Sequence, residues 1–274
     1  MVVQHNLTAM NSNRMLGITT STQAKSSEKL SSGYKVNRAA DDAAGLAISE
    51  KMRRQIRGLT QASLNAQDGI SCVQTAEGAL GEVHDMLQRM NELVNKAGTD
   101  TLQQTDRSYI QSELDALISE IDRVSATTTF NEQMLLDGTF KSKRLQVGAE
   151  ASPSNQINIS IVRLSASGIG IKSVNVVSGS GLKARNQLAL IKDALKSVSK
   201  QRSDLGAVQN RLEHTIKNLD NVVENTTAAE SQIRDTDMAT EMVRYSNNNI
   251  LAQAGQSMLA QANQSNQGVL SLLG

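Results

Sequence analysis

The sequence predicts a mainly α fold, an elongated antiparallel helical bundle or coiled coil with a small β-hairpin elaboration. Only one of the 274 residues is proline, so very long helices are permitted on either side of Pro153. Aromatic residues make up 2% of the chain and Trp is absent, and without their bulk we expect no broad core. Apolar residues instead recur in alternating steps of three and four, the spacing of a narrow coiled-coil seam.

The longest seam predicts a helix from about Asp42 to Ala97. Asp42 suits the N-cap position, because its carboxylate can accept a hydrogen bond from a free backbone N–H. At 1.5 Å per residue the helix would be about 80 Å long. A shortened step within 70–76 is a stammer in the heptad pattern. The seam contains Met52, Ile56, Leu59, Ser63, Ala66, Ile70, Val73, Ala76, Leu80, Val83, Leu87, Met90, Val94 and Ala97.

Two further seams have the same spacing and predict helices over 110–124 and 188–223. Three helices with matching narrow stripes imply one bundle, which we assign to residues 42–140 and 182–233. The two seams contain Ile110, Leu114, Leu117, Ile121 and Val124, and then Leu188, Ile191, Leu195, Val198, Arg202, Leu205, Gln209, Leu212, Ile216, Leu219 and Val223.

Between these helices the apolar period changes to two. Isoleucines alternate with polar residues over 157–161, as in a half-buried strand, and 145–147 suits a partner strand. The residues 148–155 would connect the two strands. Apolar residues over 169–176 predict a third small β piece. Residues 141–181 are therefore expected to form a small β elaboration.

Composition narrows the range of functions. The net charge is +1, which gives no general attraction to nucleic acid or to anionic lipid. No run of about 18 apolar residues is long enough to span a membrane, and the first residues lack the apolar region of a secretory signal. A dedicated export route is needed if the protein leaves the cell. Cys72 is the only cysteine and is interpreted as a small filler residue.

No catalytic, cofactor-binding or metal-binding pattern is present. The histidines His5, His84 and His214 form no HExxH pattern, and no GxSxG serine is available to them. We therefore expect no enzyme activity and no cofactor. A basic cluster over 53–57 is either a solvated helix face or an electrostatic contact with another protein.

The end of the chain has an unusual composition, because no charged side chain occurs from Tyr245 to Gly274. Large apolar residues there share one seven-residue register, which predicts a helix with a weak apolar stripe. One pair of such helices is marginal in water, whereas packing against many copies removes that limit. An unpaired buried charge would be costly in such a layer. The predicted assembly residues are Leu7, Met10, Leu251, Met258 and Leu272.

Long segments of the chain closely resemble bacterial flagellin. They are "KLSSGYKVNRAADDAAGLAISEKMRRQIRGL" (29–59), "NAQDGISCVQTAEGAL" (65–80), "LGAVQNRLEHTIKNL" (205–219), "ENTTAAESQIRDTDMATEMV" (224–243) and "QSMLAQANQ" (256–264). The match covers both terminal regions, about three quarters of the chain. It resembles a short form without large outer domains.

The resemblance implies a structural subunit that polymerises into the extracellular flagellar filament for motility. Residues 1–41 and 234–274 would pair as the inner filament layer and be disordered in the monomer. The subunit would leave the cell through the flagellar secretion channel. Implied partners are other copies of the chain, an export chaperone at the carboxyl-terminal arm, and the filament cap and hook-junction proteins. Two alternatives stay open: a hook-junction or export-tip relative, and a filament-borne enzyme. The segments 41–52 and 233–239 favour the main subunit.

The resemblance also implies recognition by Toll-like receptor 5. The segment Leu87–Val94 is similar to the receptor's contact segment in flagellins, and Arg89, Leu93 and Glu113 match the pattern. Asn91 departs from the arginine that is common there. The other interpretation is that Arg89 is a solvated bundle residue that also packs between subunits.

Overall fold

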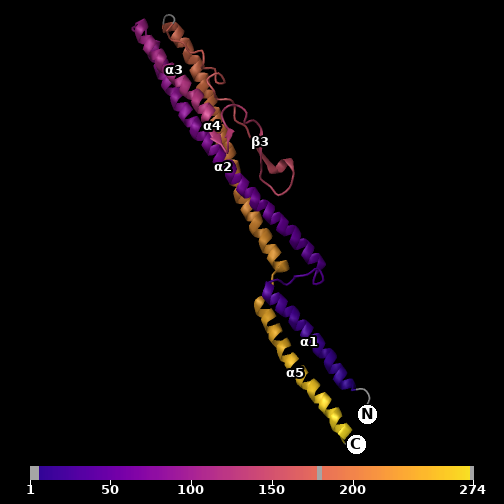
Figure 1. Cartoon of the computed structure of the whole chain (residues 1–274). Helices are drawn as coiled ribbons and strands as arrows, with labels where there is room; N and C mark the ends of the chain where they lie inside the picture. Colours follow the sequence, from indigo (N-terminus) through magenta and orange to yellow (C-terminus); the bar gives the residue numbers. More distant parts are fainter. Residues whose placement is uncertain (1–5, 178–180, 272–274) are drawn as a thin grey trace. The chain divides into compact units, whose positions relative to one another are not determined.

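The computed structural model describes residues 6–177 and 181–271. The chain forms two compact units. The terminal unit contains Met1–Ile56 and Glu224–Gly274, and the central unit contains Arg57–Val223. Both units are mainly helical, as predicted (Figure 1).

In the terminal unit, α1 (Leu7–Ser32) and α5 (Met238–Ser271) lie side by side (Figure 1). Asn6 donates a hydrogen bond to the carbonyl of Ala262, and Leu16 lies beside Gly255. The two helices are therefore antiparallel. Among the described residues, no helix is long and apolar enough to cross a membrane.

The helix ends follow from local sequence. The Asn6 side chain accepts a hydrogen bond from the N–H of Ala9 at 3.0 Å and caps α1. Gly33 ends α1 at φ 76°, a left-handed conformation that favours glycine. Asp42 accepts from the N–H of Gly45 at 2.9 Å, which confirms the predicted N-cap of the next helix.

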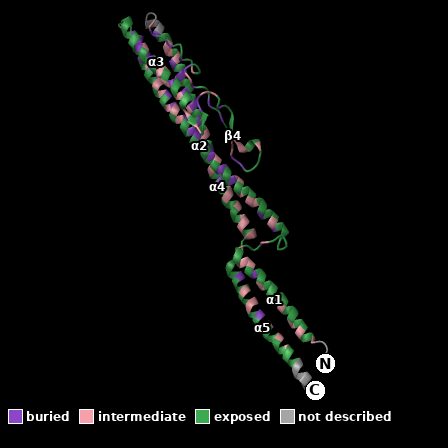
Figure 2. Cartoon of the chain, in the orientation of Figure 1, coloured by how far each residue is buried: buried purple, intermediate pink, exposed green. Residues whose placement is uncertain are grey.

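The central unit is a bundle of three helices, α2 (Ala43–Ala97), α3 (Gln104–Thr127) and α4 (Gly181–Arg234), of which α2 and α4 also enter the terminal unit. The predicted seams are confirmed as the core, with side chains such as Leu87, Leu114 and Ile191 fully buried. Figure 2 shows buried residues along this bundle and mostly exposed or intermediate residues along α1 and α5.

Two small antiparallel sheets accompany the bundle. The predicted hairpin is confirmed as β3 (Lys143–Gln146) and β4 (Gln156–Ile159), with Leu145 opposite Ile157 and the 3-10 helix η1 (Pro153–Asn155) in the connection. A second hairpin, β1 (Thr129–Phe130) and β2 (Gln133–Met134), was not predicted from the sequence. Its turn places Asn131 and Glu132 at positive φ, which is the geometry of a two-residue hairpin turn.

The predicted third β piece at 169–176 is wrong. Most of its apolar residues are buried against the bundle, but the segment has no strand partner. A helix side chain satisfies its backbone instead: Gln111 donates to the carbonyl of Val174 at 3.2 Å and accepts from the N–H of Val176 at 2.9 Å. Gln201 bonds the nearby 160–162 backbone in the same way. Each amide takes the place of a neighbouring strand.

Candidate assembly site

A seam of mostly small or polar side chains joins α1 and α5. Cα atoms of the two helices come within 8 Å of one another. Gly255 permits this close approach, because a Cβ at this position would lie only 3.3 Å from the Leu16 side chain. The buried and half-buried seam residues recur in steps of three and four: Ala9, Ser12, Leu16, Thr19, Gln23, Ser26 and Leu30 on α1, and Glu241, Tyr245, Asn248, Ala252, Gly255, Leu259 and Ala262 on α5.

The predicted assembly residues do not lie in this seam. Leu7 is 69% exposed, Met10 64%, Leu251 57% and Met258 59%, while Leu272 lies outside the described residues. Small residues such as Ser26, Ala252 and Gly255 take several of the seam positions instead. The two helices therefore pack through one face each, and the predicted apolar stripe lies exposed on a different face.

Other large apolar side chains are also exposed in the terminal unit. An isolated exposed Leu or Met is ordinary, but many on one pair of helices are typical of an interaction surface. They include Met15, Ile18, Met238, Met242, Val243 and Ile250.

A groove of about 340 Å³ lies between α1 and α5. Seam residues Ser12, Leu16 and Gly255 line it, together with the large exposed side chains of Met15, Leu251 and Met258. The groove has no charged residue in its lining. A depression of small residues beside large apolar ones has the form of a hole that accepts a side chain from another helix.

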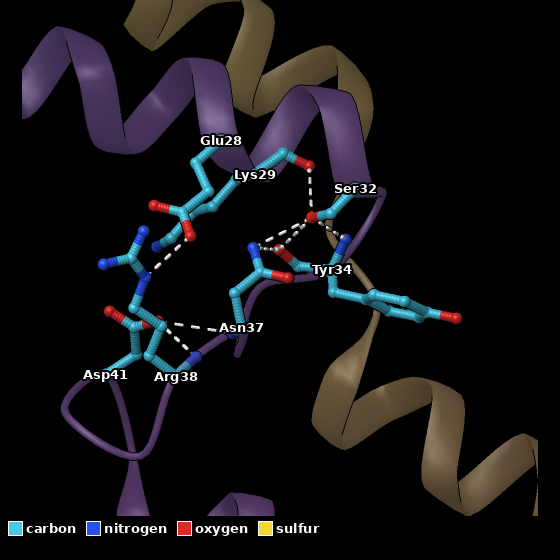
Figure 3. A network of polar contacts seen from close by, with 7 residues as sticks. All are labelled: Glu28, Lys29, Ser32, Tyr34, Asn37, Arg38 and Asp41. Atoms are coloured by element: carbon cyan, nitrogen blue, oxygen red, sulfur yellow. Dashed lines mark hydrogen bonds and ion pairs between the residues drawn. The ribbon is translucent and has the colours of Figure 1, made fainter.

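A hydrogen-bonded loop follows α1 (Figure 3). Arg38 pairs with Glu28 at 2.9 Å, and the Asn37 side chain donates to Ser32 Oγ at 2.8 Å. The backbone N–H of Arg38 donates to Asp41 at 3.0 Å and holds the pKa of that carboxyl below its ordinary value. The loop between α1 and α2 therefore has a defined conformation.

Arg234, the last residue of α4, joins several segments of the terminal unit. Its guanidinium lies 4.5 Å from the centre of the Tyr34 ring, within cation–π range. It also pairs with Glu50 at 3.2 Å and with Glu230 at 3.9 Å. Glu230 accepts a hydrogen bond from Ser49 at 2.7 Å. These contacts hold the end of α4 against the start of α2 and the loop after α1.

The three residues predicted for receptor contact meet at a groove between α2 and α3, with a volume of about 560 Å³. Arg89 lies 2.9 Å from Glu113 and 3.0 Å from Glu92, and hydrogen bonds to these two carboxylates raise the pKa of Arg89. Tyr109 is 75% exposed in the same groove, whereas Leu93 is only 4% exposed. Arg89 and Glu113 are available at the surface, and Leu93 belongs mainly to the core.

The remaining candidate residues take ordinary structural roles. Cys72 is buried, and burial raises the pKa of its thiol. His84 contacts Gln88 at 2.8 Å. Arg53 pairs with Glu50, and the neighbouring Arg54 is exposed. Within the ranges 6–177 and 181–271, no cluster of His, Cys, Asp and Glu is arranged to hold a metal ion.

Known proteins resemble this chain over almost its whole length. Residues 3–141 match the bacterial flagellin N-terminal helical region, and residues 188–273 match the bacterial flagellin C-terminal helical region. A flagellin of Halalkalibacterium halodurans is 53% identical over 273 residues, covering 100% of both chains. The flagellar filament 31.3 kDa core protein of Treponema maltophilum is 48% identical over 285 residues, again covering 100% of both.

A solved structure described as a putative flagellar hook-associated protein from Vibrio parahaemolyticus also shares the fold. It has a TM-score of 0.61 and 15% identity, and the match covers 71% of this chain and 100% of that one. At this identity the likeness concerns the fold alone.

The chain has long helical seams and a pair of terminal helices with an uncovered apolar face. These features are typical of a structural protein that packs with other helices. The chain belongs to the bacterial flagellin family. It is a short form, since residues 142–187 are all that lies between the two matched helical regions. Membership of this family makes it a structural protein and not an enzyme.

Proposed function

We propose that this chain is the subunit of an extracellular flagellar filament and polymerises with copies of itself for motility. The observation that carries the proposal is the outward face of α5, where Leu251 and Met258 are more than half exposed in a segment without charges. Exposure of such an apolar face to water is unfavourable, and burial against another helix would lower the free energy of the chain.

A second copy of the same chain is the occupant that this surface fits best. The groove between α1 and α5 has an uncharged lining, and the exposed apolar residues of another α1–α5 pair can fill it. Family membership supports this choice, because related chains are filament core proteins. In this arrangement residues 1–41 and 234–274 form the inner filament layer.

The terminal helices are expected to be mobile in the free subunit. Their seam contains mainly Ala, Ser, Thr, Gly and Asn, so the pairing of α1 with α5 buries little apolar area. Isolated helices of this kind are marginal in water. Assembly supplies the missing contacts and orders them.

Export and handling before assembly follow from the same surface. An uncovered apolar tail would promote aggregation in the cell, so an export chaperone is expected to hold the carboxyl-terminal arm until the subunit enters the flagellar secretion channel. At the ends of the filament, the cap and hook-junction proteins would meet the same terminal helices.

The test is elongation from filament seeds. Purified subunits are mixed with short filament fragments, and the product is measured by sedimentation and by negative-stain microscopy. A filament subunit lengthens the seeds above a threshold concentration. A hook-junction relative binds seed ends without lengthening them, and that result would contradict the proposal.

We propose recognition by Toll-like receptor 5 as a second function. It is favoured by the groove between α2 and α3, where Arg89, Glu113 and Tyr109 present charged and aromatic groups to solvent. Arg and Tyr are frequent anchors at protein interfaces. Direct binding of the receptor ectodomain to the subunit and to its Arg89→Ala variant tests this function.

A further inference from the structure

The methionines of the terminal unit are unusually accessible. Met10, Met15, Met238, Met242 and Met258, five of the ten in the chain, are between 47% and 64% exposed. Methionine normally fills gaps in apolar cores, as the fully buried Met90 of α2 does. An exposed thioether is open to oxidants, and its sulfoxide is polar.

We propose that Met15 and Met258 form an oxidation site that controls whether a free subunit can join the filament. They line the groove between α1 and α5 from opposite helices. This inference rests on the proposed function, because the groove must be buried when copies assemble.

The modifying reagent is hydrogen peroxide. A lone pair of the methionine sulfur attacks one peroxide oxygen, so that an S–O bond forms while the O–O bond breaks. The departing hydroxide and the proton of the transferred oxygen leave as water. Sulfur loses two electrons, peroxide gains them, and the product is an uncharged sulfoxide.

Oxidation of these two residues should change assembly without changing the fold. Met15 is 54% exposed and Met258 is 59% exposed, and neither belongs to the seam between α1 and α5. In the free chain, water can solvate both sulfoxide oxygens. A groove filled by an apolar side chain excludes that water, and a buried polar atom without a partner is costly.

The position of the two methionines also makes their oxidation depend on whether the subunit is free or assembled. Both thioethers are accessible in the free chain and would be covered after assembly. Peroxide should therefore oxidise Met15 and Met258 quickly in free subunits and slowly in finished filaments. The site would act before incorporation and leave existing filaments intact.

The first test requires no variant. Wild-type subunits are partly oxidised with hydrogen peroxide, the peroxide is removed with catalase, and seeds are added. Peptide mass spectrometry then measures the sulfoxide fraction of each methionine in the pellet and in the supernatant. We expect sulfoxides at Met15 and Met258 to be at least tenfold depleted from the pellet, while Met134 of the central unit, 46% exposed, is distributed equally. Equal distribution of sulfoxides at Met15 and Met258 overturns the proposal.

The second test uses a double variant, Met15→Leu with Met258→Leu, and a control variant, Met134→Leu. After oxidation of the exposed methionines, wild type and the control should need at least tenfold more subunit to elongate seeds. The rise in threshold should be several-fold smaller for the double variant, in which Met10, Met238 and Met242 can still be oxidised. Treatment of oxidised wild type with methionine sulfoxide reductases should restore elongation. If oxidised double variant and oxidised wild type fail equally, other methionines are responsible and the assignment is wrong. Failure of unoxidised wild type to elongate would instead contradict the filament function itself.

Discussion

The Met258→Lys substitution tests whether the outward face of α5 becomes buried on assembly. Met258 is 59% exposed in the single chain, beside the groove between α1 and α5. Because it lies outside the seam of the helix pair, the free variant should keep the helicity and the melting temperature of wild type. The effect is expected only when copies pack together.

The expected size follows from the contact that is lost. Removing a methionine from a packed site costs about 2 to 5 kcal/mol. An unpaired ammonium adds to this cost unless the long stem of lysine carries it to water. A net loss of about 3 kcal/mol would raise the critical concentration for elongation roughly 100-fold, because 1.4 kcal/mol corresponds to a factor of ten.

Seeded sedimentation over a series of subunit concentrations measures this threshold directly. The matched control is Met134→Lys, the same chemical change at a residue of β2 that is 46% exposed in the central unit. It should leave the threshold within about threefold of wild type, since surface changes cost about 0.5 kcal/mol or less. If Met258→Lys elongates at the wild-type threshold, the outward face of α5 is not buried and the reasoning fails.

Three further predictions concern other parts of the chain. Arg89→Ala should weaken receptor binding by about 1 to 2 kcal/mol without changing the melting temperature, whereas Leu93→Ala should destabilise the bundle by about 2 to 5 kcal/mol. Binding assays and thermal melts separate the two effects. Unaltered binding by Arg89→Ala would show that the receptor site lies elsewhere. Gln111→Leu should lower stability by about 1 to 3 kcal/mol in denaturant titrations, because it leaves two backbone groups without their partner. Amide exchange should be fast over 7–32 and 238–271 in the free subunit and slow in the filament, and strong protection in a verified monomer would contradict mobile ends.

The bundle and the β3–β4 hairpin could be predicted because their signals are local and strong. Large apolar residues recur along α2 at the coiled-coil spacing, and Ile157 and Ile159 alternate with polar residues. The heptad spacing does not identify Leu93 as a core residue, since it stands one position before the seam residue Val94. Both are buried, because this part of α2 packs against more than one neighbour.

The backbone partner of the 169–176 segment and the pairing of α1 with α5 could not be predicted from the periodicity of large apolar residues. The alternation over 169–176 describes burial correctly, but the partner of its backbone is the side chain of Gln111, far away in sequence. On α1 and α5, small residues such as Ser26 and Gly255 occupy the seam and carry no hydrophobic signal. A search that counted Ala, Ser, Thr and Gly as seam residues would have found both faces.

The large-residue seam of the bundle and the small-residue seam of the α1–α5 pair have different consequences for stability and for assembly. Along α2, large side chains such as Leu80 and Leu87 point into the bundle and are fully buried, so the chain itself satisfies them. Along α5, small residues such as Ala252 and Gly255 take several of the inward positions, while Leu251 and Met258 remain exposed. A helix pair that used its large residues internally would be more stable alone and would have less apolar surface for a neighbour. The weak pairing of α1 with α5 is therefore consistent with a chain whose ends become fully packed only among other copies.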